Sequence, residues 1–195
     1  MSKVLVLMST LNGERYIREQ LDSLLENASE DIQLDLMVRD DGSSDNTLNI
    51  LNEYKDVLHI TCMRGENLGA AQSFRELIKS CPTGYHAFAY ADQDDVWEKD
   101  KISAALESLR QYSGKLPALW YCGVSYYTDG KSGDTSCCSY EKATCFESVI
   151  NTFSTTNGCT MVFNEELLQV LRSCDDGKID MHDSFTHAMC LAVNG

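Results

Sequence analysis

Four short apolar segments alternate with four helical patterns in the first 112 residues, and this alternation constrains the fold most. The apolar segments are Lys3–Met8, Leu34–Val38, His59–Met63 and His86–Ala91. After each segment, apolar residues recur at helical spacing, and the last such pattern is Lys101–Tyr112. Strands that alternate with helices pack as a parallel sheet covered by helices. We therefore expect one α/β domain over residues 1–195, with a mostly parallel central sheet flanked by helices.

Polar or acidic residues follow every one of these predicted strands. In chain order they are Thr10, Asn12 and Glu14, then Asp40 and Asp41, then Asn67, and finally Asp92 and Asp94. Ligands of such sheets bind just beyond the carboxyl ends of the strands. We expect these side chains to meet at one edge of the sheet, and we also expect Thr10 or Asn12 to cap the first helix.

The second half of the chain is less regular. The apolar run Ala118–Val124 predicts a strand, Asp129–Cys138 a loop or hairpin, and Cys159–Phe163 a short strand or buried segment. Helices are expected at Glu165–Leu171 and His182–Val193, with Asp180 as the candidate N-cap of the second. The chain stops at residues 194–195 without a tail, so we expect an interrupted domain that is truncated at its C-terminus.

The run Asp92-Gln93-Asp94-Asp95 places three carboxylates directly after an apolar strand. Unpaired buried carboxylates are costly, so packing alone does not explain them. Mg²⁺ or Mn²⁺ explains them well, because these ions bind a few carboxylates and complete their shell with water and substrate phosphates. An acidic turn that caps the following helix is the alternative. Taken alone, the motif supports both readings equally.

A second acidic motif, Asp40-Asp41-Gly42-Ser43, follows the second predicted strand. Carboxylates there would accept charge-assisted hydrogen bonds from the N–H groups of a base and the hydroxyls of a ribose. The alternative is a solvated turn in which Ser43 or Ser44 caps the next helix. Without further context the turn is the better reading.

Charge and cysteine content limit the function classes. The net charge is −14, from 16 basic and 30 acidic residues, and the basic residues are scattered, so we expect no nucleic-acid partner. The apolar run Val4–Met8 is too short to cross a membrane, and we expect no transmembrane segment. Nine cysteines without a CxxC pair or a secretory signal predict reduced thiols in the cytoplasm.

In their order and spacing, these four strand-end motifs resemble the family-2 glycosyltransferases, which have the GT-A (nucleotide-diphospho-sugar transferase) fold. The run Asp92–Trp97 resembles the rhamnosyltransferase-like branch, which builds bacterial surface polysaccharides. The resemblance is strong from Lys3 to Leu109 and weaker onward to Gly195. It implies a nucleotide-sugar-binding half at residues 1–112 and an acceptor-side half at residues 113–195.

The resemblance also implies a role for each matching position on the donor side. Thr10, Asn12 and Glu14 lie where the first loop of the family contacts the nucleotide. Asp40 and Asp41 match the acidic pair that contacts the base or ribose. Asp92 matches a residue that contacts both donor and metal, and Asp94 is the stronger candidate for direct metal ligation.

On the acceptor side, Met181-His182-Asp183 resembles the later carboxylate motif of the family, which supplies the catalytic base. The family often has Glu-Asp before an aromatic residue there; in this chain His182 replaces the Glu and Ser184 precedes Phe185. Asp183 is thus the predicted base. The predicted acceptor-side residues are Asp95, Gly158, Thr160 and His182. Without the resemblance, His182 reads as an ordinary polar residue at a helix start, and residues 157–160 equally well as a tight turn.

The implied reaction is an inverting, metal-dependent transfer of a sugar from a nucleotide-diphosphate donor, a dTDP- or UDP-sugar. The implied acceptor is a hydroxyl of a glycan or lipid-linked saccharide, in the cytoplasm at the inner face of the membrane, with peripheral membrane association. A non-catalytic module that binds sugar nucleotides or glycans is one alternative. A sugar-phosphate nucleotidyltransferase is a weaker one, because Ser9–Gly13 holds one glycine and no lysine of the expected phosphate loop.

Overall fold

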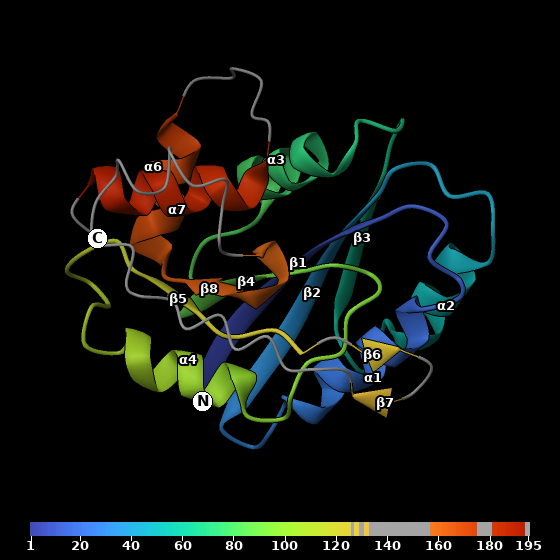
Figure 1. Cartoon of the computed structure of the whole chain (residues 1–195), viewed down its shortest axis with the longest axis horizontal. Coiled ribbons are helices and arrows are strands. Elements are labelled where there is room, and N and C mark those ends of the chain that lie inside the picture. The colour runs from blue at the N-terminus through green and yellow to red at the C-terminus, as the bar shows by residue number, and fades with distance from the viewer. Residues whose placement is uncertain (126, 129–130, 133–156, 175–180, 194–195) are drawn as a thin grey trace.

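A six-stranded sheet forms the centre of the protein in the computed structural model, which describes residues 1–125, 127–128, 131–132, 157–174 and 181–193 (Figure 1). The strands are β1 (Ser2–Thr10), β2 (Ile32–Asp40), β3 (Ile60–Arg64), β4 (Ala87–Ala91), β5 (Leu119–Tyr121) and β8 (Met161–Phe163). Their order is β3-β2-β1-β4-β8-β5. The first four strands run parallel, and β8 runs antiparallel to both β4 and β5. The predicted mostly parallel sheet is confirmed.

Helices cover both faces of the sheet. One face carries α1 (Ile17–Glu26), α2 (Thr47–Tyr54) and α4 (Lys101–Leu109), and the other carries α3 (Ala70–Ser80), α6 (Glu165–Ser173) and α7 (His182–Ala192). Strand β1 shows how the sequence builds these layers. Val4, Val6 and Met8 pack on the first group of helices, and Leu5 and Leu7 on the second. Side chains alternate between faces along a strand, so a strand that is apolar throughout is covered on both sides.

The two caps predicted for the first helix are wrong. Helix α1 begins at Ile17 with Tyr16 as its N-cap and no side-chain cap. Thr10 and Asn12 are drawn into contacts with other loops, and Asn12 has a positive φ of 49°. A short loop therefore separates β1 from α1. Its polar side chains form hydrogen bonds with the neighbouring loops at the edge of the sheet.

Several predictions fall wholly or partly outside the described residues. Of the predicted loop or hairpin at Asp129–Cys138, only β7 (Lys131–Ser132) is described, and it pairs antiparallel with β6 (Tyr127–Thr128). Asp180 itself lies outside the described residues, but the prediction that it caps α7 is wrong, because the N-cap is Met181 and no side chain caps this helix. The cysteines of the described ranges are free thiols. Within the same ranges, no helix has the length and apolar character needed to cross a membrane.

Candidate active site

The loops that follow β1 and β2 are joined at the carboxyl edge of the sheet. The N–H of Asn12 donates to Ser43 Oγ at 2.9 Å, and the N–H of Ser44 donates back to Asn12 Oδ1 at 2.9 Å. The Glu14 carboxylate accepts from the N–H of Asn46 at 2.8 Å. Asn12 and Glu14 are exposed and hold the two predicted nucleotide loops as one surface.

Gln93 connects the acidic loop after β4 to this surface. Its Oε1 accepts from the Thr10 hydroxyl at 2.6 Å and from the N–H of Leu11 at 3.0 Å, and its Nε2 donates to Leu11 O at 3.2 Å. Gly13 makes room for it, since a Cβ there would collide with Gln93 Oε1. The sequence interpretation missed Gln93, although its position between Asp92 and Asp94 was a usable signal.

Both carboxylate oxygens of Asp41 have partners within the protein. Its Oδ1 accepts from Ser73 Oγ at 2.6 Å and pairs with Arg39. Its Oδ2 accepts from the N–H groups of Leu68 and Gly69, both at 3.1 Å. With 4% of its surface exposed, Asp41 thus ties the end of β2 to the start of α3.

Asp40 differs from its neighbour because one of its oxygens has no partner within the described ranges. Oδ2 accepts from the N–H groups of Gly42 at 3.1 Å and Ser43 at 3.0 Å, and it lies 3.6 Å from Nε of Arg64. Oδ1 is buried and accepts no hydrogen bond from the described residues. Buried polar atoms are normally paired, so this oxygen is an unused acceptor, and it lies beneath the surface because Asp40 is 0% exposed.

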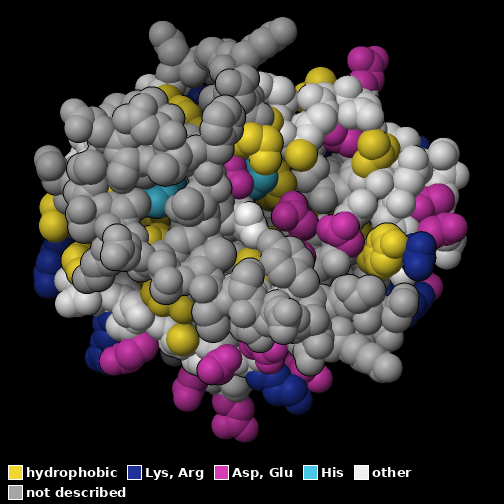
Figure 2. All heavy atoms as spheres, in the orientation of Figure 1, with side chains coloured by type: hydrophobic (Ala, Val, Ile, Leu, Met, Phe, Trp, Pro, Cys, Tyr) yellow, Lys and Arg dark blue, Asp and Glu magenta, His cyan; other side chains and the backbone are white. Residues whose placement is uncertain are grey.

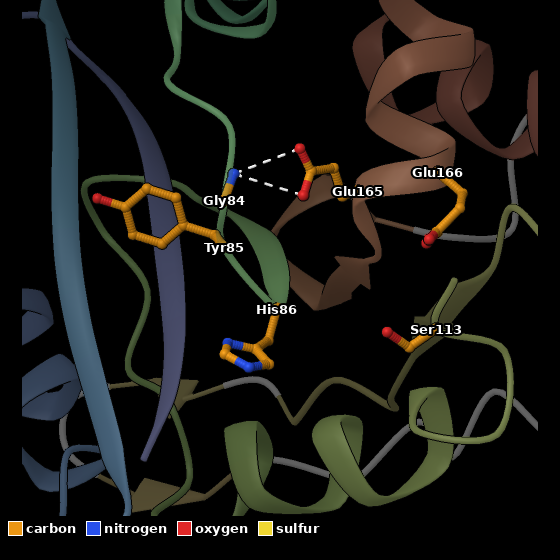
Figure 3. A pocket seen from close by; sticks show the side chains of 6 residues that line it. All are labelled: Gly84, Tyr85, His86, Ser113, Glu165 and Glu166. Atoms are coloured by element: carbon orange, nitrogen blue, oxygen red, sulfur yellow. Dashed lines mark hydrogen bonds between the residues drawn. The ribbon is translucent and has the colours of Figure 1, made fainter. Parts of the chain in front are cut away.

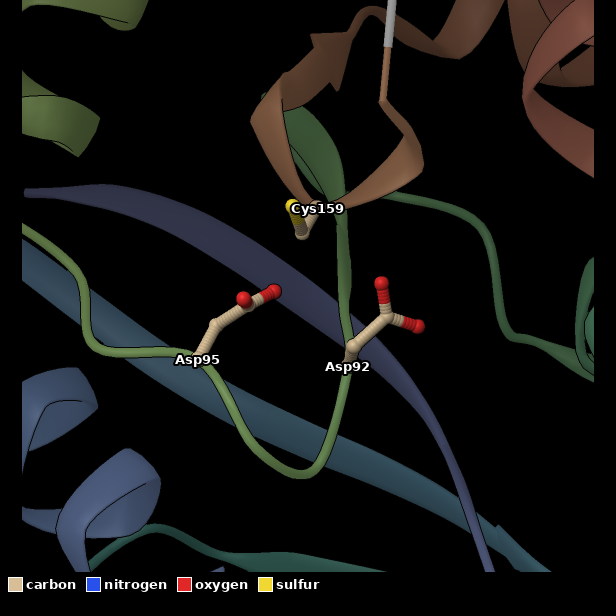
Figure 4. A group of neighbouring side chains, drawn as sticks. All are labelled: Asp92, Asp95 and Cys159. Carbon is tan, nitrogen blue, oxygen red and sulfur yellow. The ribbon is translucent and has the colours of Figure 1, made fainter. Parts of the chain in front are cut away.

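Asp92, Asp95 and Cys159 form the cluster that could hold a metal ion (Figure 4). One ligand atom from each lies within 4.8 Å of the others. Burial first, and then the charges of neighbouring carboxylates, raise the pKa of Asp92 to about 7. Burial also raises the pKa of Asp95, whose Oδ2 has no partner in the described part of the chain. Carboxylates crowded in this way suit a divalent cation. Asp94 is exposed and is not a member of this cluster.

A buried cation, Lys101, lies close to this cluster. Its ammonium donates to Cys159 O and lies 3.4 Å from the ring centroid of Trp97. Burial lowers its pKa to about 8, against the opposing effect of nearby acidic groups that include Asp95. The sequence interpretation treated Lys101 only as the first residue of an amphipathic helix, and no local pattern separated it from other lysines.

Helix α7 brings Asp183 to the same region. Asp183 is 8% exposed, and its Oδ1 accepts from the N–H of Ser184 at 2.6 Å. Its charge contributes to the raised pKa of Asp92, so the two carboxylates lie close enough to interact electrostatically. The predicted acceptor-side residues Gly158 and Thr160 lie in the 3-10 turn η1 (Gly158–Thr160) directly before β8. His182 is buried against Phe74.

The predicted residues thus gather at one edge, from β1, β2, β4, η1 and α7. On the face in Figure 2, acidic side chains gather near the centre, beside histidine and hydrophobic side chains. A separate hollow of about 230 Å³ lies at the opposite edge, before β4 (Figure 3). It is lined by Gly84, Tyr85, His86, Ser113, Glu165 and Glu166, and it contains none of the predicted site residues.

Comparison with known proteins shows that this chain is similar to glycosyltransferases. The family profile described as Glycosyl transferase family 2 matches residues 5–166. The dTDP-rhamnosyl transferase RfbG of Shigella flexneri is 32% identical over 171 residues, which are 83% of this chain and 55% of that protein. The putative teichuronic acid biosynthesis glycosyltransferase TuaG of Bacillus subtilis is 30% identical over 113 residues, 56% of this chain and 43% of that protein.

Solved structures match the fold. Residues 1–349 of TarS from S. aureus, in complex with UDP-GlcNAc, superpose with a TM-score of 0.72 at 20% identity, covering 97% of this chain and 53% of that one. The mannosyltransferase PcManGT of Pyrobaculum calidifontis, in complex with GDP-Man and Mn²⁺, gives a TM-score of 0.66 at 20% identity, with 94% and 50% covered. The chain spans about half the length of these proteins, and the shared architecture is the GT-A fold.

Proposed function

The chain belongs to glycosyl transferase family 2, and we propose that it holds the donor site and catalytic base of an enzyme that transfers a sugar to a saccharide hydroxyl. The observation that carries the proposal is the meeting of the joined β1 and β2 loops with the carboxylates of Asp92, Asp95 and Asp183. In a parallel sheet such an edge is the place where nucleotides bind.

On the donor side, the nucleotide lies against the loop that carries Thr10, Asn12 and Glu14. Of the two predicted acidic residues, we propose that Asp40 makes the contact to the base or ribose once the turn that covers it shifts, because its Oδ1 has no partner among the described residues while Asp41 is fully engaged. The similarity to a dTDP-rhamnosyl transferase and the fold shared with a UDP-GlcNAc complex support a dTDP- or UDP-sugar as the donor.

A divalent cation, Mn²⁺ or Mg²⁺, fits the residues after β4. Asp92 and Asp95 offer oxygen ligands, and burial, followed by the charges of neighbouring carboxylates, raises the pKa of Asp92 to about 7. We propose Asp92 and Asp94 as its ligands, with the exposed Asp94 free to turn toward a bound diphosphate. A bound cation would neutralise the charge that develops on the departing diphosphate. The presence of Mn²⁺ in the PcManGT complex supports the same choice.

The transfer inverts the configuration at the reacting carbon. Asp183 takes the proton of the acceptor hydroxyl while that oxygen attacks C1 of the donor sugar. The bond between C1 and the diphosphate oxygen breaks on the opposite side, and the nucleoside diphosphate leaves with the electron pair. This path needs no covalent intermediate on the protein.

The acceptor is a glycan or a lipid-linked saccharide, bound on the side of Asp95, η1 and α7. Gly158, Thr160 and His182 belong to this side of the site, where all three are buried and lie behind the surface that the acceptor meets. The similarity to a dTDP-rhamnosyl transferase and to TuaG supports a role in surface-polysaccharide synthesis. A cytoplasmic reaction at the inner face of the membrane, with peripheral association, is part of the same proposal.

A thermal-shift panel tests the donor side. A ligand that binds only the folded chain raises its stability by mass action. We expect dTDP- or UDP-sugars to raise the melting temperature, and Mn²⁺ to enlarge the rise. The control is Asp40→Asn, which should lose most of the shift while keeping its own melting temperature without ligand close to that of the wild type. No shift with any UDP-, dTDP- or GDP-sugar would contradict the proposal.

A further inference from the structure

The His182 imidazole is buried and has no polar partner in the described part of the chain. It is 6% exposed, and neither ring nitrogen forms a hydrogen bond with the described residues. Its ring stacks on Phe74 of α3, with centroids 3.9 Å apart and planes at 22°, and it meets the ring of Tyr90 edge-on at 5.0 Å. Polar groups buried in this way are normally paired. His182 is an exception to this rule: among the described residues its ring makes packing contacts, as an apolar side chain would, and no hydrogen bond.

The Nε2 edge of the ring meets Gly158. A Cβ on this glycine would collide with His182 Nε2 and would lie 3.1 Å from Cε1. Gly158 has a negative φ and needs no glycine for its backbone conformation. Its missing side chain is what admits the ring. Gly158 and His182 therefore fit each other closely, although they come from different elements, η1 and α7.

The contact between Gly158 and His182 lies between the acidic loop, which carries Asp95, and Asp183, the proposed base. The residue after Gly158 is Cys159, whose thiol lies within 4.8 Å of a carboxylate oxygen of Asp95 and whose carbonyl accepts from Lys101. The residue after His182 is Asp183. A continuous series of contacts thus runs from the acidic loop through η1 and the imidazole to the start of α7. A second anchor, Tyr90 OH to Thr186 Oγ1 at 2.9 Å, holds the next turn of α7 to β4.

We propose that His182 is a positioning residue. With one face on Phe74 and its Nε2 edge against Gly158, the ring fixes the first turn of α7 and so sets the Asp183 carboxylate against the acidic loop. This inference rests on the proposed function, in which Asp183 is the base. A displacement of about 1 Å at a reacting group can cost roughly 10²-fold in rate, so a ring that only packs can control turnover. Burial lowers the pKa of His182 to about 4, in agreement with a ring that stays neutral.

The test compares His182→Ala with His182→Phe and His182→Leu. Removing the ring should lower kcat by roughly 10²-fold and leave donor KM nearly unchanged, because the donor lies on the other side of the site. At least one of the two apolar variants should keep kcat within about threefold of the wild type, since neither nitrogen has a partner to lose among the residues that the structure describes. A proton-carrying histidine would behave differently, because every variant would lose turnover equally. That result in folded variants would overturn the proposal.

The Gly158 contact is tested by a double-mutant cycle. Gly158→Ala should lower both the melting temperature and kcat. Adding His182→Ala should recover much of the melting temperature, because the collision is gone, but it should not restore kcat. The matched control is His187→Ala, which removes another buried histidine of α7 and should lower stability without changing kcat. Strictly additive stability losses in the cycle would overturn the packing claim.

Asp183→Asn, assayed in the same series, separates the two claims. If Asp183→Asn is inactive and His182→Ala is fully active, positioning by the ring is wrong and the proposed base stands. If Asp183→Asn is fully active, the proposed base is wrong, and the positioning role built on it falls too. A wild-type chain without turnover would contradict the proposed function, and the stability cycle would still decide whether the ring and Gly158 are packed as described.

Discussion

Replacing Asp41 with asparagine should damage the fold more than the nucleotide site. Asp41 is paired with Arg39, which is itself 7% exposed and also donates to Ser73 Oγ at 3.0 Å and Glu66 O at 3.2 Å. Asparagine keeps the shape and an acceptor oxygen but removes the charge. Breaking a buried ion pair on one side typically costs about 3–5 kcal/mol, because the remaining charge is left buried and uncompensated.

This loss of unfolding free energy can be measured as a decrease in melting temperature. For a domain of this size, each kcal/mol lowers the melting temperature by roughly 2–4 °C, so Asp41→Asn should melt roughly 6–20 °C below the wild type. Differential scanning calorimetry measures it, beside urea unfolding monitored by circular dichroism. The double variant Arg39→Met with Asp41→Asn should recover part of the loss, because the stranded cation is gone.

Asp40→Asn is the matched comparison, one residue away. It keeps an oxygen for the N–H groups of Gly42 and Ser43, and its ionic neighbour Arg64 is solvated, so its stability should change by only about 1 kcal/mol. Its effect should instead appear in nucleotide affinity. If Asp41→Asn kept the wild-type stability and lost nucleotide binding, Asp41 would belong to the pocket and the reasoning from its four contacts would be refuted.

Three further changes test other parts of the site. Asp94→Ala should remove the Mn²⁺ dependence of nucleoside diphosphate affinity in calorimetric titrations, and an unchanged Mn²⁺ effect would exclude Asp94 as a ligand. Asp183→Asn should leave donor affinity nearly unchanged and lower steady-state turnover by roughly 10²–10⁴, the usual range for a general base, and full activity would remove it from the mechanism. His182 has a pKa lowered from 6.5 to about 4, so between these values the unfolded chain binds the extra proton and stability rises with pH. Urea unfolding at pH 4.5 to 7 should therefore show a gain on the order of 3 kcal/mol that His182→Phe lacks, and parallel profiles for the two proteins would contradict the shift.

The sheet could be predicted because its strands and helices carry strong local periodicities. Lys3–Met8 and His86–Ala91 are apolar at nearly every position, since helices cover both faces of β1 and β4. The helix caps could not be predicted from composition. Asn12 is a good capping residue, but Ser43 and Ser44 compete for its backbone N–H and side chain, and these partners lie far along the chain.

The sequence predicted where the candidate residues lie in the fold better than it predicted the hydrogen bonds among them. Strand ends alone placed Asp40, Asp92 and Thr10 at one edge, because parallel strands share their carboxyl ends. The saturation of Asp41 depends on Ser73 and Arg39, and no spacing rule links Ser73 to Asp41. The relation of Asp183 to Asp92 came from resemblance alone, since the helix start carries no local signal for it.

The release of nucleoside diphosphate from a dTDP- or UDP-sugar, followed by a coupled assay or chromatography, tests the central claim most directly. The proposed reaction requires that release depend on both Mn²⁺ or Mg²⁺ and a saccharide acceptor, with one glycosylated product formed per nucleotide released. Donor binding without release, under conditions that include acceptor and metal, would contradict the claim and identify a binding module instead.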